Sequence, residues 1–291
     1  MKIFLTGASG YIGGSLALAL LSKGHEVRGL TRSEKSANEL KALGIFPVLG
    51  DLDNLDILKS EAFQADAVIN TANADHLEAV LAMLDGLTGK HQKFIHTSGS
   101  SIIGDDARGN QLSPSIFTDD TALLVDARKQ ARRNIDLKVL EAASAGIQSC
   151  VIIPSLIYGY GLGIQKNSIQ VPFLVRNAIE NDAVQIIGKG LNAWSNVHIE
   201  DLVDLYLLAL EKAPAGASYF AENGEATFLE IAQSISARLN IPSIEHLPAE
   251  TAADRWGMSR ALFSLGSNSR VRSVRARSEL NWKPKHTSVQ A

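Results

Sequence analysis

The stretch LTGASGYIGG, residues 5–14, places glycine at positions 7, 10, 13 and 14, directly after the apolar N-terminal run. KIFLTG predicts a strand, and GGSLALALLSKG predicts a helix that ends at Gly24. Gly7, Gly10 and Gly13 therefore lie in the turn between a strand and a helix. There, glycines permit a tight turn and a close approach of a diphosphate, which the free amides of the helix start can bind. The stretch predicts a dinucleotide site; the alternative is a glycine turn without a ligand.

The same alternation of short apolar runs and longer amphipathic stretches continues to about residue 155. Further strands are predicted at HEVRGLTR, IFPVLGD, ADAVINTA, KFIHTSG and SCVIIPS. Helices are predicted between them, at SEKSANELKALG with Ser33 as its cap, and near residues 53–60 and 75–88. Strands that alternate with helices favour an α/β fold with a doubly wound parallel sheet, the Rossmann fold.

The alternation loosens after residue 155, and no linker rich in proline, glycine or charge separates the two halves. We expect a dinucleotide-binding domain at residues 1–155 and a smaller C-terminal α/β lobe, mainly for substrate, at residues 156–291. The amphipathic segment 196–212 is expected to pack back on the first domain. TFLE at 227–230 predicts a capping box, because a threonine three residues before a glutamate satisfies two amides of a helix start.

Composition excludes several classes of protein. Of the 291 residues, 45% are hydrophobic and 20% are charged, with a net charge of -3, so neither disorder nor nucleic-acid binding is indicated. The single cysteine, Cys150, lies in the apolar run CVIIP and is expected to be a buried hydrophobe. No run of about 18 apolar residues is present, and Gly7 interrupts the N-terminal run too early for a signal peptide. We expect a cytoplasmic protein without a membrane partner; monomer and homodimer remain open.

Arg32 bears on the choice of cofactor. The second predicted strand ends at Thr31 and Arg32, about twenty residues beyond the glycines, where the adenosine ribose of a bound dinucleotide is expected. An acidic residue there would bind both ribose hydroxyls, whereas a guanidinium would pair with a 2′-phosphate. The sequence therefore favours NADP(H) over NAD(H). The alternative is that Arg32 is only a solvated residue at a strand end.

Several motifs together resemble the extended short-chain dehydrogenase/reductase superfamily, and within it the NAD-dependent epimerase/dehydratase branch. They are Thr6-Gly7-x-x-Gly10-x-x-Gly13, then Gly50-Asp51-Leu52, and Thr97-Ser98-Gly99 after the fifth predicted strand. Later matches are Pro154 with Ile157-Tyr158-Gly159, the run Val197 to Asp201, and the run Leu280 to Pro284. The resemblance spans nearly the whole chain, and its N-terminal motif is the most specific for a dinucleotide.

The resemblance implies where a cofactor would be held. Amides around Ser9, Tyr11 and Ile12 would bind the diphosphate. The glycines, Thr6 and Arg32 would also contact the cofactor. Asp51 and Leu52 would meet the adenine, and Thr71, Ala72 and Asn73 would meet the ribose and phosphates. Pro154 and Ile157 would flank the nicotinamide. On residue type alone, Asp51 could instead cap the following helix, and Pro154 could simply end a strand.

The catalytic pair of this superfamily, Tyr-x-x-x-Lys, is absent. Aligning the helix on Glu141 places Arg133 at the tyrosine position and Leu137 at the lysine position. Arg133 could stabilise a developing alkoxide but could not supply its proton. Ser98 and Ser101 after the fifth strand, and Tyr158 in the YGYG loop, are candidate substitutes. The alternative for the serines is that they only satisfy turn amides.

The remaining patterns are less specific. His198 stands just before a long amphipathic helix and is expected to be a packed or capping residue. No histidines, cysteines and carboxylates have metal-ligand spacing, so no metal is expected. We expect an NADP(H)-dependent oxidoreductase that reduces a small carbonyl compound with a non-standard proton donor. A nucleotide-sugar epimerase or dehydratase, and a non-catalytic NADP(H)-binding redox sensor or regulator, remain the alternatives.

Overall fold

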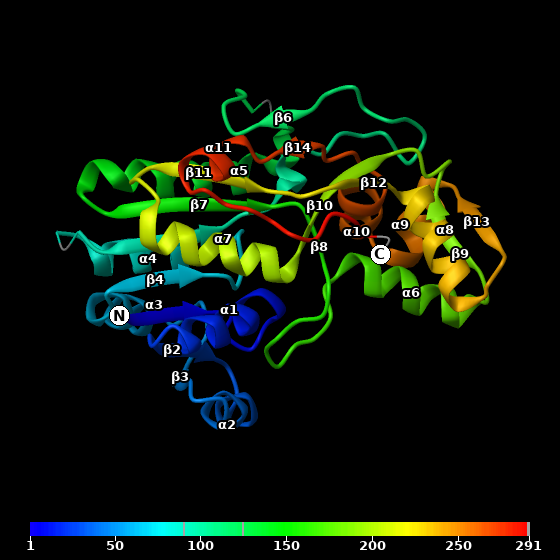
Figure 1. Ribbon diagram of the computed structural model, residues 1–291. Helices are drawn as coiled ribbons and strands as arrows, with labels where there is room; N and C mark the ends of the chain where they lie inside the picture. The colour runs from blue at the N-terminus through cyan, green and yellow to red at the C-terminus, as the bar shows by residue number, and fades with distance from the viewer. Residues whose placement is uncertain (90, 124, 290–291) are drawn as a thin grey trace.

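A sheet of seven parallel strands forms the centre of the molecule (Figure 1). The structure is a computed structural model, and it describes residues 1–89, 91–123 and 125–289. From edge to edge the order is β11-β7-β5-β4-β1-β2-β3. Chain order reverses beside β1, which is where open α/β sheets bind ligands, outside the carboxyl ends of their strands. The bounds are β1 Lys2–Thr6, β2 Glu26–Thr31, β3 Phe46–Leu49, β4 Ala67–Asn70, β5 Lys93–Thr97, β7 Gln148–Pro154 and β11 Ala217–Ala221.

Helices cover both faces of the sheet. Side chains from α1, α2 and α7 share one apolar core, and side chains from α3, α4 and α5 share the other. Within the described ranges, no helix is both long enough and apolar enough to cross a membrane. The bounds are α1 Tyr11–Ser22, α2 Glu34–Ala42, α3 Leu55–Gln64, α4 Leu77–Leu87, α5 Gln130–Glu141 and α7 Ile199–Lys212.

The sequence of β1 is continuously apolar because both of its faces are buried. Ile3 and Leu5 point into one core and Phe4 points into the other, and all three side chains are fully buried. Successive side chains of a strand face opposite sides of the sheet, so a strand covered on both faces has no polar position. The fold class predicted from the sequence, a doubly wound α/β sheet, is confirmed.

A smaller part lies beyond the carboxyl edge of the sheet, at the right of Figure 1, and closes a third core around Trp194, Phe228 and Trp256. The capping box forms at the start of α8, where Thr227 and Glu230 exchange hydrogen bonds. The principal elements of the smaller part are β8 Leu156–Tyr158, α6 Gln170–Asn181, β9 Val184–Ile187, β10 Ala193–His198, β12 Glu225–Thr227, α8 Phe228–Leu239, β13 Ile244–Leu247 and α9 Ala249–Trp256.

One strand from the second half of the chain belongs to the main sheet. β11 pairs in parallel with β7, so the strand at ASYFA extends the first sheet rather than the smaller part. The remaining short elements are η1 Ser100–Ile103, β6 Phe117–Thr118, η2 Ala127–Lys129, η3 Ala142–Ala145, α10 Met258–Arg260, η4 Ala261–Leu265, β14 Val271–Arg272 and α11 Val274–Glu279.

Asp201 on α7 holds the C-terminal segment against the main sheet. The amides of Lys285 and His286 each donate to its carboxylate at 2.9 Å. The indole of buried Trp282 donates to its backbone oxygen, also at 2.9 Å. Because Asp201 is itself buried, removing its carboxylate leaves these amides without their acceptor.

We predict that Asp201→Ala lowers the free energy of unfolding by about 2 to 4 kcal/mol, since each amide left without an acceptor costs about 1 to 3 kcal/mol. Urea denaturation followed by circular dichroism measures this difference. Asp204→Ala is the control, because Asp204 is exposed one turn further along the same helix. Equal midpoints for the two variants would show that Asp201 does not hold the segment.

Candidate functional site

The glycine turn after β1 is shaped by two close approaches. Gly7 adopts φ +73°, a conformation that L side chains rarely take. A Cβ on Gly13 would stand 2.2 Å from the carbonyl oxygen of Gly7, so only glycine lets α1 start this close to the turn. No side chain caps Gly10 at the helix start. The first amides of α1 are therefore free for an anion, and the turn fits a dinucleotide diphosphate.

A cavity of about 500 Å³, called here the nucleotide cavity, opens beside this turn. Thr6 lies behind it, fully buried, with its hydroxyl 2.5 Å from Oδ1 of Asn70. Asp53 and His76 also line the cavity, with 3.0 Å between Oδ1 and Nε2, and were not predicted from the sequence. Among its lining residues are the expected contacts Gly7, Ser9, Gly10, Arg32, Asp51, Leu52, Thr71, Ala72 and Asn73.

A second cavity of about 520 Å³, the substrate cavity, lies between the sheet edge and the smaller part. Pro154 and Ile157, the residues expected at a nicotinamide, line it together with Ser98 and Ser101. Ile12, whose amide is expected at the diphosphate, lines this cavity as well. The opposite wall comes from the smaller part, through Trp194, Ile169, Gln170 and residues between 256 and 264. This cavity is where a cofactor ring and a substrate could meet.

Tyr11 and Tyr158 join the two parts rather than enter the substrate cavity. The Tyr11 hydroxyl donates to the carbonyl oxygens of Tyr158 and Gly159, at 3.0 and 2.9 Å. The Tyr158 ring packs edge-on against His198, with 5.2 Å between centroids. Tyr158 is not among the residues that line the cavity, so the structure does not bring this candidate donor to the site.

On α5, the structure separates the candidate Arg133 from its neighbour Arg132. Arg132, not Arg133, lines the substrate cavity. Asp136, four residues later, is fully buried and accepts a hydrogen bond from the hydroxyl of Ser98 at 2.9 Å. Arg133 instead stands 4.0 Å from Asp136 as a partly exposed ion pair. Arg132 and Asp136 are four residues apart, as the tyrosine and lysine of the missing Tyr-x-x-x-Lys pair would be. An arginine and a carboxyl thus stand at that spacing on α5.

A chain of buried polar groups stands behind Ser98. Burial raises the pKa of Asp136 to about 6, and burial lowers the pKa of His96 to about 4. Nδ1 of His96 lies 3.1 Å from Nδ2 of Asn70. Because Oδ1 of Asn70 accepts from Thr6 and from the amide of Ala72, the Asn70 amide donates to His96.

The neutral His96 ring therefore carries its proton on Nε2. That atom lies 3.8 Å from Oδ1 of Asp136, and neither atom has a hydrogen-bond partner among the described residues. Two buried polar atoms without a partner that lie this close together are rare in folded proteins. Ser98 and Asp136 form a hydrogen-bonded pair that reaches the cavity through Ser98, and His96 lies next to this pair without a hydrogen bond to it.

Three of these residues could have been found from the sequence. Ile135 and Val139 mark the buried face of the helix, and Arg132 and Asp136 lie on that face by helical spacing. His96 falls inside an apolar strand, KFIHT, where a buried polar residue is informative. Lys129 and Arg260, which also line the cavity, carry no such pattern.

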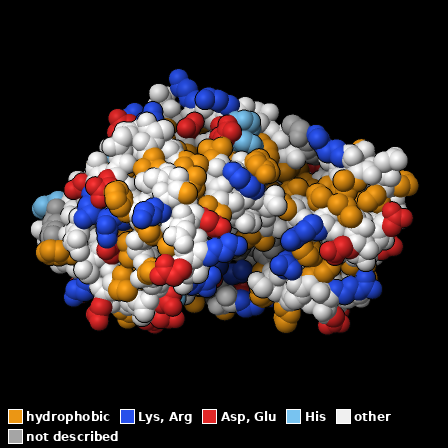
Figure 2. Space-filling view, turned by 90° about the horizontal axis from the view of Figure 1, so that it is seen from below, with side chains coloured by type: hydrophobic (Ala, Val, Ile, Leu, Met, Phe, Trp, Pro, Cys, Tyr) orange, Lys and Arg blue, Asp and Glu red, His pale blue; other side chains and the backbone are white. Residues whose placement is uncertain are grey.

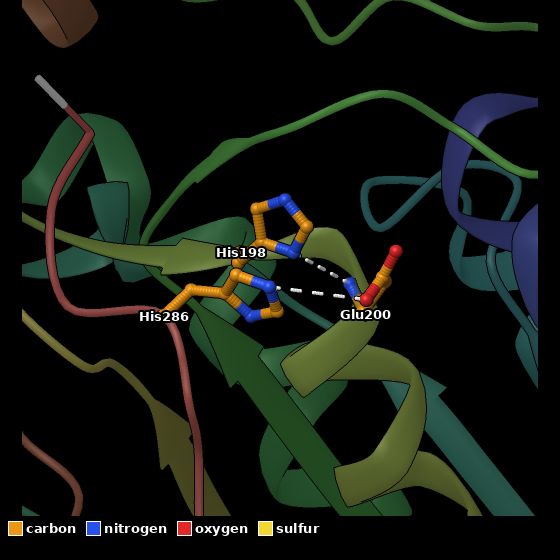
Figure 3. Close-up of side chains that lie close together, drawn as sticks. All are labelled: His198, Glu200 and His286. Atoms are coloured by element: carbon orange, nitrogen blue, oxygen red, sulfur yellow. Dashed lines mark hydrogen bonds and ion pairs between the residues drawn. The ribbon is translucent and has the colours of Figure 1, made fainter. Parts of the chain in front are cut away.

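His198, Glu200 and His286 gather at the start of α7, with potential ligand atoms within 4.8 Å of one another (Figure 3). Nδ1 of His198 already accepts from the amide of Glu200 at 3.3 Å and so caps the helix. The two imidazole rings stack, with centroids 3.8 Å apart, so their nitrogens lie side by side rather than converge on one point. We interpret the group as a cap and a tie for the C-terminal segment; the absence of a metal stays a prediction.

Comparison with known proteins identifies the family and supplies named relatives. The family model for the NAD-dependent epimerase/dehydratase family matches residues 3–221. A Schizosaccharomyces pombe protein named uncharacterized protein C2A9.02 is 33% identical over 303 residues, covering 99% of this chain and 97% of its own length. Oxidase ucsJ of Acremonium sp is 33% identical over 328 residues, which cover 97% of this chain and 92% of the oxidase. A Stigmatella aurantiaca 4-hydroxy-2-methyl-3-oxo-4-farnesyl-3,4-dihydroquinoline-1-oxide ketoreductase is 26% identical over 328 residues, covering 100% and 94%.

A solved structure shows the same fold. UDP-glucuronic acid 4-epimerase from Bacillus cereus, in complex with UDP-glucuronic acid and NAD, superposes with a TM-score of 0.79 at 17% identity. The match covers 100% of this chain and 96% of that one. At this identity the likeness establishes the arrangement of the two parts and not the reaction.

We predict that Gly13→Ala lowers the affinity for a dinucleotide by about 100-fold or more, because the new methyl group displaces amides whose hydrogen bonds to a charged group are worth about 1.5 to 3 kcal/mol each. Calorimetric titration with NADPH measures the loss. Gly24→Ala is the control: Gly24 follows the end of the same helix with φ +78°, and no atom stands within 4 Å of its added Cβ. The Gly24→Ala variant should have a lower free energy of unfolding and unchanged affinity for NADPH. Unaltered binding by Gly13→Ala would contradict the proposed turn contact.

Proposed function

This chain belongs to the NAD-dependent epimerase/dehydratase family, and on that premise we propose that it is an NADP(H)-dependent reductase of a small carbonyl compound. The observation that carries the proposal is the Ser98 hydroxyl, which lies on the cavity wall with Pro154 and Ile157 and is backed by Asp136. A hydroxyl in contact with a carboxyl of raised pKa can deliver a proton to a carbonyl oxygen. The ketoreductase relative supports the same reaction class.

The cofactor would be held by the first turn and by residues of the nucleotide cavity. The amides at the start of α1 would bind the diphosphate, and Asp51 and Leu52 would meet the adenine. Arg32 lies exposed at the rim of this cavity and forms no ion pair within the described ranges. Its guanidinium is available for a 2′-phosphate, which supports NADP(H). When bound, the reduced nicotinamide supplies the hydride.

The protein's part in the reaction is to move one proton. In this route Asp136 is protonated and donates to Oγ of Ser98, the reverse of the hydrogen bond that Ser98 gives to the carboxylate. Ser98 gives its own hydroxyl proton to the carbonyl oxygen as it takes the proton of Asp136. The buried Asp136 carboxylate takes up a proton again through Ser98 once the product has left the cavity. His96 lies beside the second oxygen of Asp136, with 3.8 Å between Nε2 and Oδ1. Ser101 is a weaker candidate, because its hydroxyl accepts from Arg132 at 3.1 Å and no acid stands behind it.

We predict that Arg32→Ala weakens NADPH binding by about 10- to 100-fold and leaves NADH binding unchanged, because only NADPH carries the phosphate that a charged hydrogen bond of about 1.5 to 3 kcal/mol would hold. Fluorescence titration with each nucleotide tests this. Lys41→Ala, at the far end of α2, is the control for a general loss of positive charge. Tighter binding of NADH than NADPH by the parent protein would contradict the cofactor assignment.

The proton route predicts a pH profile. Reduction needs protonated Asp136, so the rate constant should level off below pH 6 and fall as pH rises through the pKa of about 6. Ser98→Ala should lose about 10²- to 10⁴-fold in rate, and Asp136→Asn should lose the inflection. Ser101→Ala should keep the inflection. The assay is NADPH consumption against a panel of aldehydes and ketones.

The same assay separates the alternative functions. No consumption of NADPH across a broad panel, together with tight NADPH binding, would favour a redox sensor. Conversion of a nucleotide sugar without net change in the cofactor would favour an epimerase. An inflection that survives in Asp136→Asn would show that another group supplies the proton.

A further inference from the structure

The outer wall of the substrate cavity is positively charged. Lys129, Arg132 and Arg260 line it, and among its described lining residues there is no carboxylate. In the space-filling view from below, Lys and Arg side chains gather around the hollow between the two parts of the molecule (Figure 2). Cations that face a cavity without acids attract an anionic ligand.

Arg132 is the one of these three cations that pairs with a described carboxylate. Arg260 donates to the backbone oxygen of Trp256, at 3.4 Å. Nε of Arg132 donates to Oδ1 of Asp75 at 2.7 Å, and its second nitrogen pairs with the other oxygen of the same carboxylate. Its third nitrogen donates to Ser101. Arg132 is thus neutralised and held in place, so it does not supply the unpaired charge.

Lys129 and Arg260 have no ion pair with any carboxylate in the part of the chain that the structure describes. The ammonium of Lys129 lies 4.7 Å from the ring centroid of Phe263, and the guanidinium of Arg260 lies 4.4 Å from that of Phe173. A ring face positions a cation but does not cancel its charge.

The acids nearest to Lys129 are already engaged. Asp75 pairs with Arg132, and Asp126 pairs with Arg128 at 2.8 Å. Burial accordingly lowers the pKa of Lys129 from its usual value. An anion bound at this point would offset that cost, because an opposite charge favours the charged form of an ammonium group.

The phosphates of a dinucleotide do not account for these cations. Gly7, Ser9, Gly10 and the predicted 2′-phosphate site at Arg32 line the nucleotide cavity. Of the residues expected at the phosphates, only Ile12 is among the described lining residues of the substrate cavity. Neither Lys129 nor Arg260 lines the nucleotide cavity, so the predicted phosphate sites leave these two cations without an anion.

The rest of the same wall is apolar. Trp194, Trp256 and Phe263 supply aromatic surface, and Ile169 adds an exposed aliphatic side chain. Gln170 is the one side-chain amide in the lining. A ligand that matches this wall has a flat or apolar body and one charged end.

We propose that the substrate is a small organic acid: a carbonyl compound with an aromatic or apolar body whose carboxylate binds Lys129 and Arg260. That the acid also carries a reducible carbonyl rests on the proposed function; that it is anionic rests on the cavity alone. The carboxylate end contacts the smaller part of the molecule, and the carbonyl end lies toward Ser98.

Binding to the complex with NADP⁺ tests the anion separately from catalysis, because the oxidised cofactor has no hydride to give to a carbonyl. The probes are two pairs, para-formylbenzoate with its methyl ester and phenylglyoxylate with its methyl ester, measured by calorimetry. We expect at least one acid to bind about tenfold or more tighter than its ester, as a charged hydrogen bond of about 1.5 to 3 kcal/mol requires. That preference should shrink as salt is added.

The double variant Lys129→Gln/Arg260→Gln should abolish the preference for the acid and leave ester and NADP⁺ binding unchanged. Lys138→Gln/Arg255→Gln is the matched control, since it removes the same charges from exposed positions of α5 and α9 outside the cavity lining. Equal binding of acid and ester by the parent protein, or no binding of either acid, would overturn the proposal. So would tighter binding of UDP-glucose than of both acids, because the anion would then be a phosphate.

Failure of the proposed function gives a different pattern. If acids bind through Lys129 and Arg260 but no NADPH is consumed, the anion site stands and the reductase proposal falls. If neutral carbonyl compounds are reduced while acids neither bind nor react, the reductase proposal stands and the anion site falls.

Discussion

The contact on which the structure depends is the approach of α1 to the carbonyl oxygen of Gly7. At 2.2 Å, a Cβ on Gly13 would not fit there, so the helix starts directly on the turn with its first amides uncapped. The same turn stands against Thr71 after β4, which would clash with any side chain at Gly7. The diphosphate site is therefore made from backbone alone, and it lies at the point where the strand order reverses.

Helix α1, which begins at this turn, also positions the part of the molecule that forms the outer wall of the substrate cavity. Tyr11, its first residue, ties the loop at Tyr158 and Gly159 to the helix, and Ser15 accepts from the amide of Leu162 in the same loop. Gly163 approaches Gly14 so closely that a Cβ on Gly163 would stand 2.5 Å from the Gly14 backbone. The smaller part of the molecule is thus fixed against α1, and the glycines at 13 and 14 serve two different contacts.

The sequence predicts the sheet better than the site for a physical reason. Strands buried on both faces are continuous apolar runs, so the pattern predicts six strands of the main sheet. The seventh strand, β11, lies far along the chain, and its pairing with β7 leaves no local trace in the sequence. Exposed Glu141 carries no information on helix phase, whereas buried Ile135 and Val139 do, and these place Arg132 and Asp136 on the buried face. Lys129 and Arg260 come from distant segments, and only the packing of the smaller part brings them to one cavity.

The loss of Tyr-x-x-x-Lys changes where the proton must come from. In the superfamily that this chain resembles, an ammonium lowers the pKa of a cavity tyrosine. Here burial raises the pKa of Tyr158 to about 12, and no tyrosine is among the described residues that line the substrate cavity. A general acid works best when its pKa is near the working pH. Asp136 meets that condition because burial raises its pKa to about 6, and its hydrogen bond to Ser98 brings the proton to the cavity wall. Arg132 and Asp136, which stand at the spacing of that pair, contact different serines: Arg132 donates to Ser101, and Asp136 accepts from Ser98.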